Sequence, residues 1–543
     1  MDKEKDTSEH RTPVTEKQQE GILTSGHNIS YWVDSVLPLK FSPLTQNIET
    51  EVVIVGGGIA GLTTAYCLTQ QGKRVILIED GFLGSGESGR TTAHIVNALD
   101  DRYTEIERLH GEKGVRLAAE SHTAAIEFVA ETVRRENIDC DFKRVNGYLF
   151  LHPTDKIKTL EDELEATNKA GILTELIVGV PGIPSESGPC LQFPHQAQFH
   201  IMKYLSGLAK AITSTGGQIF TETHAEEFKK DGVIANGFMV KAEHVVIATN
   251  TPINDLVTMH TKQFPYRSYV IGALIPKGSI EPALWWDTGD HESKWDSYPY
   301  NYVRTQPYDA ASDLLICGGQ DHKTGQADTE DIPEEDRYKA LEEWARLHFP
   351  MMEQIIYRWS GQVMEPLDGM GFIGRNPGDK NVYIATGDSG NGMTHGTIAG
   401  ILISGIIAGR NNPWEDLYSP SRINLKTSVR YLKETGSMAA QYVDFLKKGD
   451  VTSADELSMG EGAIMSMGLK KFALYRDEQG TLHSYSAVCP HLGCILQWNG
   501  EEKSFDCPCH GSRFTFEGRV INGPAISDLE KVEIKKISGQ SGR

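Results

Sequence analysis

Two short segments rich in cysteine and histidine, close to the C-terminal end, constrain this chain more than any other feature. Residues 489–494 read Cys-Pro-His-Leu-Gly-Cys, and residues 507–512 read Cys-Pro-Cys-His-Gly-Ser. A Cys-x-His loop facing a Cys-x-x-His loop offers one thiolate and one imidazole from each side, which is a donor set for a metal centre. We therefore predict four metal ligands: Cys489, His491, Cys507 and His510.

Two kinds of metal centre use such ligands. Two thiolates and two imidazoles can hold zinc in a tetrahedral site. They can also hold a [2Fe–2S] cluster, with the thiolates on one iron and the imidazoles on the other. The two boxes, with Pro508, Gly511 and Ser512, resemble the Rieske [2Fe–2S] domain, and we favour it because so many positions would otherwise coincide by chance. The resemblance implies a small all-β domain whose cluster carries one electron at a time.

The resemblance also implies roles for residues beside the ligands. Rieske domains of the respiratory type have a disulfide between the two cluster loops, at the positions of Cys494 and Cys509 here. The family serine, here Ser512, donates a hydrogen bond to a cluster sulfur, and high-potential members have a tyrosine where this chain has Phe514. Since such donors stabilise the reduced cluster, we expect an intermediate or low potential within roughly −150 to +300 mV.

A glycine-rich turn near the N-terminal end provides the second motif. Residues 51–79 read as a buried strand, a glycine turn, a helix and a second strand that ends in Glu79. In this pattern Gly56 makes a tight turn, Gly58 lets the backbone approach a pyrophosphate, and Gly61 lets helix and strand pack closely. Glu79 is placed to accept a hydrogen bond from a ribose hydroxyl, so the motif predicts a dinucleotide site.

Further segments favour FAD as that dinucleotide. Residues 84–93 form a second loop of small residues, suited to further contact with a long ligand. Predicted strands at 245–250 and 382–387 end in small residues, and the second leads into a loop at 388–396 before a helix. Over about residues 31–419 the order of these segments resembles the D-amino-acid oxidase superfamily of FAD-dependent oxidoreductases, which includes glycine and sarcosine oxidases.

The resemblance implies where FAD lies. It places the pyrophosphate on the glycine turn, the ribose on Glu79 and the flavin ring beside the two later loops, with a helix N-terminus stabilising the anionic reduced flavin. We expect non-covalent FAD, because neither His94 nor Cys317 lies in a convincing tether motif. The predicted FAD-binding residues are Gly56, Gly58, Ile59, Ala60, Gly61, Glu79, Arg90, Thr91, Thr92, Ala93, Ala225, Thr249, Gly392, Met393 and Thr394.

The predicted fold is an α/β FAD-binding doubly wound domain of the glutathione-reductase type, with an inserted antiparallel α+β substrate domain and a C-terminal all-β Rieske domain. In the substrate domain, Tyr302 and Arg304 could orient a substrate carboxylate, since arginine offers a bidentate fork. Alternatively, they simply pack a sheet face. The expected parts are a disordered tail (1–27), a discontinuous FAD domain (28–142, 195–263 and 362–420), a substrate domain (143–194 and 264–361), a linker with a helix at 426–447 (421–460), and the Rieske domain (461–543).

Charge limits the partners. A formal net charge of −21 and a pI near 5.3 disfavour nucleic acid or an anionic membrane surface. No apolar run reaches the roughly 18 residues of a spanning helix, and the N-terminal residues are charged where a signal peptide would be apolar. We expect a cytoplasmic protein with no membrane span. Its expected partners are a small-molecule substrate and an external one-electron acceptor or donor, either a protein or a quinone.

Three functions follow, of which we favour the first. A dehydrogenase would oxidise an amine or amino-acid-like substrate at FAD and pass electrons singly to the Rieske cluster and an external acceptor. A flavin and Rieske electron-transfer module would have no organic substrate. A Rieske oxygenase would need a mononuclear iron, for which His195 and His200 offer a tempting spacing but lack a nearby acid at Gln192.

Overall fold

The computed structural model describes residues 25–534 except 187, 255–258, 293–298, 327–333, 429–431, 433–435, 437–448 and 469. Most of the predicted tail and most of the predicted helix at 426–447 therefore lie outside the described residues. Ser25, which we assigned to the disordered tail, is fully buried and donates a hydrogen bond to the Ser85 carbonyl at 2.8 Å. The packed chain thus begins earlier than the sequence suggested.

The first sheet carries the glycine turn. Across it lie β16 (Phe372–Arg375), β17 (Val382–Thr386), β10 (Phe238–Ile247), β1 (Ile48–Val55), β2 (Val75–Ile78) and β7 (Gln218–Phe220), with β9 (Gly232–Ala235) paired to β10 and β8 (Ala225–Lys229) paired to β9. β1 runs parallel to β2 and β10, β2 to β7, and β10 to β17. Val52, Val53 and Ile54 are fully buried, as expected of a central strand covered on both faces.

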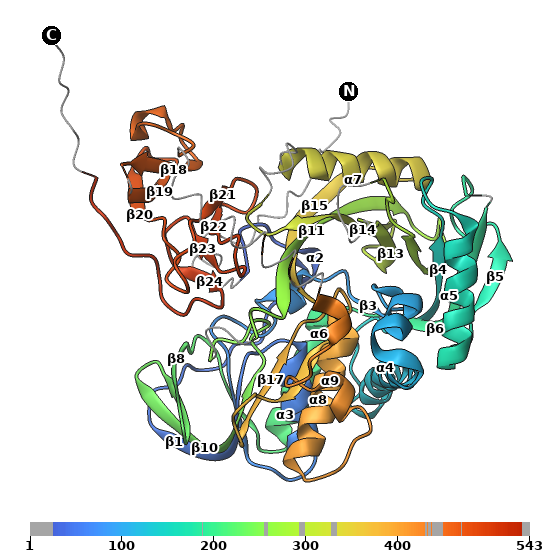
Figure 1. Ribbon diagram of the computed structural model, residues 1–543, viewed down its shortest axis with the longest axis horizontal. Coiled ribbons are helices and arrows are strands. Elements are labelled where there is room, and N and C mark those ends of the chain that lie inside the picture. The colour runs from blue at the N-terminus through green and yellow to red at the C-terminus, as the bar shows by residue number, and fades with distance from the viewer. Residues whose placement is uncertain are drawn as a thin grey trace, which may run out of the picture.

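Two helices pack closely beside this sheet. They are α3 (Ile59–Thr69), which follows the glycine turn, and α8 (Gly392–Ile407), and they lie side by side in Figure 1. Glycines make the contact possible, because a Cβ on Gly396 would lie 2.5 Å from Ile59 and one on Gly400 would lie 2.4 Å from Thr63. Within the part of the chain that the structure describes, the other α-helices are α2 (Tyr31–Asp34), α4 (Arg102–Arg135), α5 (Ile157–Ala170), α6 (Ile201–Ser214), α7 (Glu334–His348) and α9 (Glu415–Tyr418).

The second sheet is mainly antiparallel. Across it lie β15 (Ile355–Pro366), β11 (Gln263–Pro276), β14 (Ser312–Lys323), β13 (Tyr302–Pro307), β12 (Leu284–Asp287), β4 (Lys143–Phe150), β6 (Pro189–Gln198) and β3 (His94–Ile95), with β5 (Glu175–Val178) paired to β6. α7 packs against β11 and β14. β3 belongs to the second sheet, although its residues lie within the range 28–142 that we predicted for the FAD domain.

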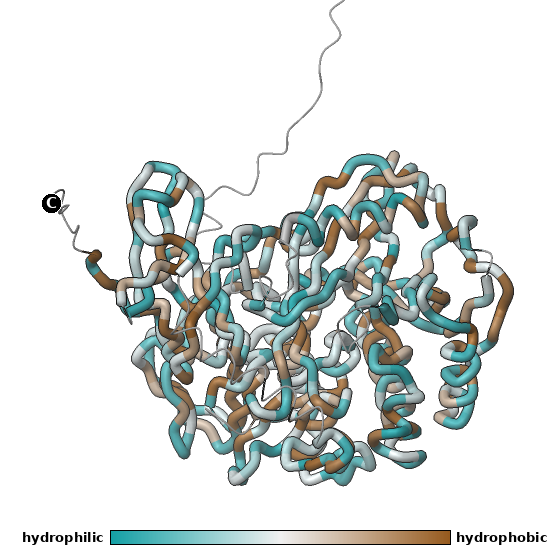
Figure 2. Tube along the Cα trace, turned by 45° about the horizontal axis from the view of Figure 1, so that its top comes forward, coloured by the Kyte–Doolittle hydropathy of each residue, from teal (hydrophilic) through white to brown (hydrophobic). Residues whose placement is uncertain are grey.

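The C-terminal part forms a separate all-β body at one side of the molecule (Figure 1). Figure 2 shows hydrophobic stretches inside the larger body and hydrophilic turns around it. Among the described residues, no helix combines the length and apolar character needed to cross a membrane. The C-terminal body has two antiparallel sheets. One consists of β18 (Glu461–Met467), β19 (Lys470–Arg476) and β20 (Leu482–Ser486), and the other of β21 (Gln497–Asn499), β22 (Ser504–Asp506), β23 (Arg513–Thr515) and β24 (Val520–Asn522).

Buried charges join this C-terminal body to the rest of the molecule. Arg90 and Glu502 form an ion pair at 3.0 Å, with side-chain exposures of 3% and 0%. Arg513 pairs with Asp506 at 3.0 Å, and Arg267, from β11, lies 3.9 Å from the same carboxylate. Three guanidinium groups and two carboxylates therefore meet at one buried interface.

Glu502 lies at the centre of these contacts. Its carboxylate also accepts hydrogen bonds from the backbone N–H of Ser360 and of Asn28, both at 3.1 Å. Burial raises the pKa of Glu502, but Arg90, Arg267 and Arg513 outweigh burial and bring that pKa down to about 2. The carboxylate is therefore charged throughout the physiological range.

Glu502→Gln should weaken the interface, because it leaves three buried guanidinium groups facing a single carboxylate. We expect a loss of about 3–5 kcal/mol of stability, the usual cost of breaking a buried ion pair. Thermal unfolding and limited proteolysis of the full chain would measure it. Glu517→Gln, which removes an exposed pair with Arg519 in the same domain, is the matched control and should cost about 0–1 kcal/mol. Equal melting temperatures for both variants would contradict the proposed importance of Glu502.

Candidate functional site

One cavity extends from the glycine turn of the first sheet to the inner strands of the second. Most of the residues predicted to bind FAD line it, and so does Tyr302. Gly61, Ala93, Thr394 and Arg304 are not among the lining residues. The predicted residues that do line it are Gly56, Gly58, Ile59, Ala60, Glu79, Arg90, Thr91, Thr92, Ala225, Thr249, Gly392 and Met393.

The glycine turn has no room for side chains. Gly56 has a φ of +111°, and a Cβ there would lie 2.3 Å from the Ala248 carbonyl oxygen. A Cβ on Gly58 would lie 2.8 Å from Ser88 Oγ, and one on Gly61 would lie 1.9 Å from the Gly56 carbonyl. Gly61 thus acts through packing, while Gly56 and Gly58 keep the backbone open to the cavity, as a pyrophosphate site requires.

Glu79 directly follows β2, next to the glycine turn. Its carboxylate accepts a hydrogen bond from the N–H of Gly57 and another from the N–H of Gly81 at 3.0 Å. Burial raises the pKa of this carboxyl group above its ordinary value, although these two donors oppose the shift. A carboxylate has about four acceptor positions, so Glu79 can hold the glycine turn and still accept from a ligand hydroxyl.

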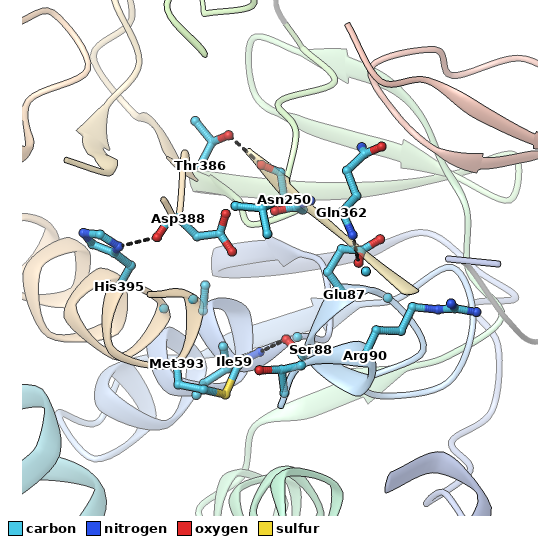
Figure 3. A pocket seen from close by; sticks show the side chains of 18 of the residues that line it. Ile59, Glu87, Ser88, Arg90, Asn250, Gln362, Thr386, Asp388, Met393 and His395 are labelled. Atoms are coloured by element: carbon cyan, nitrogen blue, oxygen red, sulfur yellow. Dashed lines mark hydrogen bonds between the residues drawn. The ribbon is translucent and has the colours of Figure 1, made fainter. Parts of the chain in front are cut away.

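The loop at 84–93 lies beside the glycine turn and forms part of the cavity wall. Ser88 Oγ accepts a hydrogen bond from the first N–H of α3, that of Ile59, at 3.0 Å. Glu87 Oε2 accepts from the backbone N–H of Gln362 at 2.7 Å. Figure 3 shows Glu87 and Gln362 on one side of the cavity and Asp388 and Met393 on the other. The sequence did not single out Glu87 or Gln362.

The N-terminus of α8 reaches the cavity through Gly392 and Met393. Asn391, just before the helix, accepts a hydrogen bond from the Asp100 N–H at 3.1 Å. Thr394 faces away, since its hydroxyl pairs with His122 Nδ1 at 2.8 Å. The geometry therefore suits Thr394 to holding α8 in place instead of contacting the cofactor.

Both predicted arginines are engaged elsewhere. The Arg90 guanidinium binds Glu502, Ser25 Oγ and the Ser360 carbonyl, and Figure 3 shows it extending away from the cavity. Arg304 is fully buried and donates to the carbonyls of Ala93 at 2.8 Å and Phe199 at 3.0 Å. Of the two roles considered for Arg304, these contacts favour packing within the sheet over binding a substrate carboxylate, because its donors already hold strand ends together.

Acceptor groups dominate the end of the cavity that lies in the second sheet. Tyr300, Tyr302, Asp100 and Asp321 line it, and the Tyr302 hydroxyl pairs with Ser268 Oγ at 2.7 Å. Oδ1 of Asp321 is buried with no hydrogen-bond partner among the described residues. Burial raises the pKa of Asp100 to about 7 and that of Asp321 to about 6.

His94 also lines the cavity, but both ring nitrogens are engaged. Its Nδ1 lies 3.0 Å from Thr92 Oγ1 and its Nε2 lies 3.3 Å from the Val303 carbonyl. Cys317 is fully buried in β14 and is not among the lining residues. Cys317 therefore does not reach the cavity and His94 is held by two hydrogen bonds, and non-covalent binding stays a prediction.

The four predicted metal ligands are brought together by the two loops. Cys489 and Cys507 are free, buried thiols, and the rings of His491 and His510 have centroids 4.9 Å apart. Nδ1 of His510 is buried without a hydrogen-bond partner among the described residues, and burial lowers the pKa of this imidazole to about 3. A neutral ring with a bare nitrogen is what a metal ligand requires, so the donor set fits a [2Fe–2S] cluster.

The two cluster loops have the same backbone design. In the first loop Cys489 N–H donates to the Cys494 carbonyl at 2.8 Å, and in the second Cys507 N–H donates to the Ser512 carbonyl at 2.8 Å. Cys494 and Cys509 form a disulfide, as predicted. Their sulfurs lie within 4.8 Å of the Cys507 sulfur. Because two of these three sulfurs are bonded to each other, the disulfide joins the loops and leaves the metal to the predicted ligands.

The histidine pair proposed for a mononuclear iron is differently placed. His195 is exposed, whereas His200 is buried, caps α6 and pairs with Ser35 Oγ at 2.9 Å. These two side chains therefore do not form the oxygenase site that their spacing suggested.

The cluster loops lie against the rest of the protein on the histidine side. His260, which precedes β11, packs against both predicted ligands, with ring centroids 5.1 Å from His491 and 5.9 Å from His510. The side chain of Gln362 donates to the Gly511 carbonyl, next to His510, at 3.1 Å. Gln362 also lines the cavity, so one residue links the cavity wall to a cluster loop.

Comparison with known proteins agrees with this organisation. Residues 51–405 match the family described as FAD dependent oxidoreductase, and residues 447–533 match the Rieske [2Fe-2S] domain. The "Putative Rieske 2Fe-2S iron-sulfur protein YhfW" of Bacillus subtilis (strain 168) is 32% identical over 93% of this chain and 97% of its own length. Both domains are thus present together in a similar protein.

Two further similarities concern the larger body. The gamma-glutamylputrescine oxidoreductase of Escherichia coli (strain K12) is 27% identical over 70% of this chain and 89% of its own length. The solved structure of glycine oxidase from Geobacillus kaustophilus superposes with a TM-score of 0.56 at 17% identity, covering 69% of this chain and all of that one, 100%. The second similarity establishes the fold alone.

Ser512→Ala should lower the midpoint potential of the cluster. The Ser512 hydroxyl is fully buried and hydrogen-bonds the Cys489 sulfur, so its loss removes a donor that favours the reduced state. One hydrogen bond of about 1 kcal/mol corresponds to a shift on the order of 40 mV for one electron. An EPR-monitored redox titration would measure it. Ser527→Ala, at an exposed position of the same domain, is the control and should leave the potential unchanged. An unchanged potential in Ser512→Ala would contradict this role.

Proposed function

This chain belongs to the FAD-dependent oxidoreductases and carries a C-terminal Rieske [2Fe–2S] domain, and from this we propose that it is a cytoplasmic amine dehydrogenase. When bound, FAD would accept two electrons as a hydride from the carbon beside the amine nitrogen, and the cluster would carry them onward singly. The resulting imine would hydrolyse. The external partner would be a one-electron acceptor.

The acceptor-rich end of the cavity carries this proposal. Asp100, Asp321 and two phenols line it, whereas the guanidinium groups of Arg90 and Arg304 are engaged elsewhere. Arg102 lines the cavity as well, and it donates to the Asp287 carbonyl at 3.4 Å. An ammonium group suits such surroundings better than a carboxylate, because buried carboxylates favour a cation. The similarity to a gamma-glutamylputrescine oxidoreductase supports an amine-bearing substrate.

The docking of the C-terminal domain supports transfer within the chain. His260 packs against both cluster histidines, and Gln362 joins the cavity wall to Gly511. His491 and His510 are buried against the larger body, with 9% and 5% exposure. The histidine side of the cluster therefore faces the larger body, which supports transfer of an electron from a reduced flavin to the cluster within the chain.

A panel of amines added anaerobically to the holoprotein would test the function. We expect an amine to bleach the flavin absorbance and to produce the EPR signal of a reduced Rieske cluster within the same turnover. The matching free amino acids should react more slowly, because Asp100 and Asp321 line this end of the cavity while the guanidinium groups of Arg90 and Arg304 are engaged in other contacts. A flavin that ferredoxin or NAD(P)H-linked partners reduce, but no amine does, would instead favour an electron-transfer module without an organic substrate.

Binding of a cation should strengthen as pH rises. With pKa values of about 7 for Asp100 and about 6 for Asp321, both carboxyls are neutral in acid and become charged through this range. Tetramethylammonium does not titrate, so its inhibition reports the carboxylates alone. We expect its inhibition constant to fall about tenfold from pH 5 to pH 8.

Asp321→Asn should flatten this dependence and weaken inhibition at pH 8. Asp309→Asn, at an exposed turn after β13, is the matched control and should retain the full dependence. Inhibition that does not change with pH in the wild type would argue against recognition of a cation by these carboxylates.

A further inference from the structure

Part of the cavity wall comes from the Rieske domain. The residues concerned lie on β24 and in the turn after it, which we name the 520–526 segment. Its cavity-lining members are Val520, Ile521, Asn522, Gly523, Ala525 and Ile526.

One end of the 520–526 segment is held by the loop that supports α3. Asn522 Nδ2 donates a hydrogen bond to Glu87 Oε1 at 3.1 Å. The other oxygen of Glu87 is held by Gln362, and its neighbour Ser88 accepts from the first N–H of α3. Asn522 is therefore attached to the part of the cavity wall that carries Glu87, which Figure 3 labels.

The other end of the segment contacts His224, which is paired with the residue that follows Glu79. The His224 ring hydrogen-bonds the backbone of Ile526 and lies 3.2 Å from Asp80, which follows Glu79. Between the two ends, a Cβ on Gly523 would lie 2.8 Å from Ile253. The segment therefore contacts the cavity wall at three lining residues, Glu87, His224 and Ile253.

The same segment is tied to the cluster. Ala525 N–H donates a hydrogen bond to Ser512 Oγ at 3.0 Å, and Ser512 lies two residues after the predicted ligand His510. One short segment thus contacts both a cluster loop and the cavity predicted to hold FAD.

Asn522 also carries an unused acceptor. Its Oδ1 is buried and has no hydrogen-bond partner among the described residues, although its Nδ2 is paired with Glu87. Leaving a buried amide oxygen unsatisfied costs about 1–3 kcal/mol, so such atoms usually have a partner when the site is filled. The hydroxyls of the FAD ribose or ribityl chain are donors of the required kind.

We propose that the 520–526 segment is a strap by which the Rieske domain closes the FAD site, with Asn522 accepting a hydrogen bond from an FAD hydroxyl. FAD then enters before the Rieske domain docks and leaves only when the strap lifts. This goes beyond the proposed function, because it concerns retention of the cofactor and holds for any substrate.

Asn522→Asp in the full-length holoprotein tests the strap. The substitution keeps the shape of the side chain but places a carboxylate 3.1 Å from the Glu87 carboxylate, which should lift the segment. We expect FAD to dissociate about tenfold faster, measured by the rise in flavin fluorescence after dilution. The Rieske EPR signal should stay unchanged, because Asn522 does not touch the predicted cluster ligands.

Two further variants secure the interpretation. Ser527→Asp adds the same charge at an exposed position that does not line the cavity, and it should release FAD at the wild-type rate. Combining Glu87→Gln with Asn522→Asp restores a donor and acceptor pair in reversed order and should slow FAD release again. If Asn522→Asp folds poorly, Asn522→Ala removes the acceptor without adding charge and should still release FAD about threefold faster.

Wild-type FAD release in both Asn522 variants, with the EPR signal intact, would overturn the strap. Faster release in Ser527→Asp would also overturn it, because the effect would then come from charge alone. A failure of the proposed function looks different: no amine would reduce the flavin, while the Asn522 variants would still lose FAD faster.

Discussion

The buried charges around Glu502 are the interaction on which the rest of this molecule depends. They hold the C-terminal body against the larger one. At this contact His260 packs against the predicted cluster histidines, and Gln362 donates a hydrogen bond to the Gly511 carbonyl beside them. The buried charges also occupy the Arg90 guanidinium, which would otherwise be available near the flavin loop. The position of the cluster and the chemical character of the cavity are therefore set by the same contacts.

Much of the fold could be predicted from the sequence because its signals are local. The glycine turn, the acid at Glu79 and the spacing of the two cluster boxes each depend on residues close together in the chain. The disulfide of Cys494 and Cys509 and the two-domain organisation followed from the same motifs. Local motifs fix which backbone atoms face the cavity, so most glycine-turn residues lie where expected.

What the sequence could not predict concerns residues whose partners lie far away in the chain. Arg90 meets Glu502, 412 residues away, and Arg304 meets the Ala93 carbonyl, 211 residues away. The sequence did not single out Asp100, Asp321 or Asn522, because none lies in a recognisable motif. Their interest comes from their position in the cavity wall. A motif identifies which charged group a position carries. The direction in which that side chain points depends on the long-range partners that the folded chain places beside it.

Buried ion pairs more readily explain the orientation of the docked domain than its affinity. Removing several charges from water costs about as much as their attraction returns, so the pairs add little net binding energy. Packing such as that of Gly511 against Pro265, where a Cβ would lie 2.6 Å away, has to supply more of it. With three guanidinium groups and two carboxylates, however, a rotated domain would leave unpaired charges buried. The ionic contacts therefore exclude other orientations and leave one in which the histidine side of the cluster packs against the larger body.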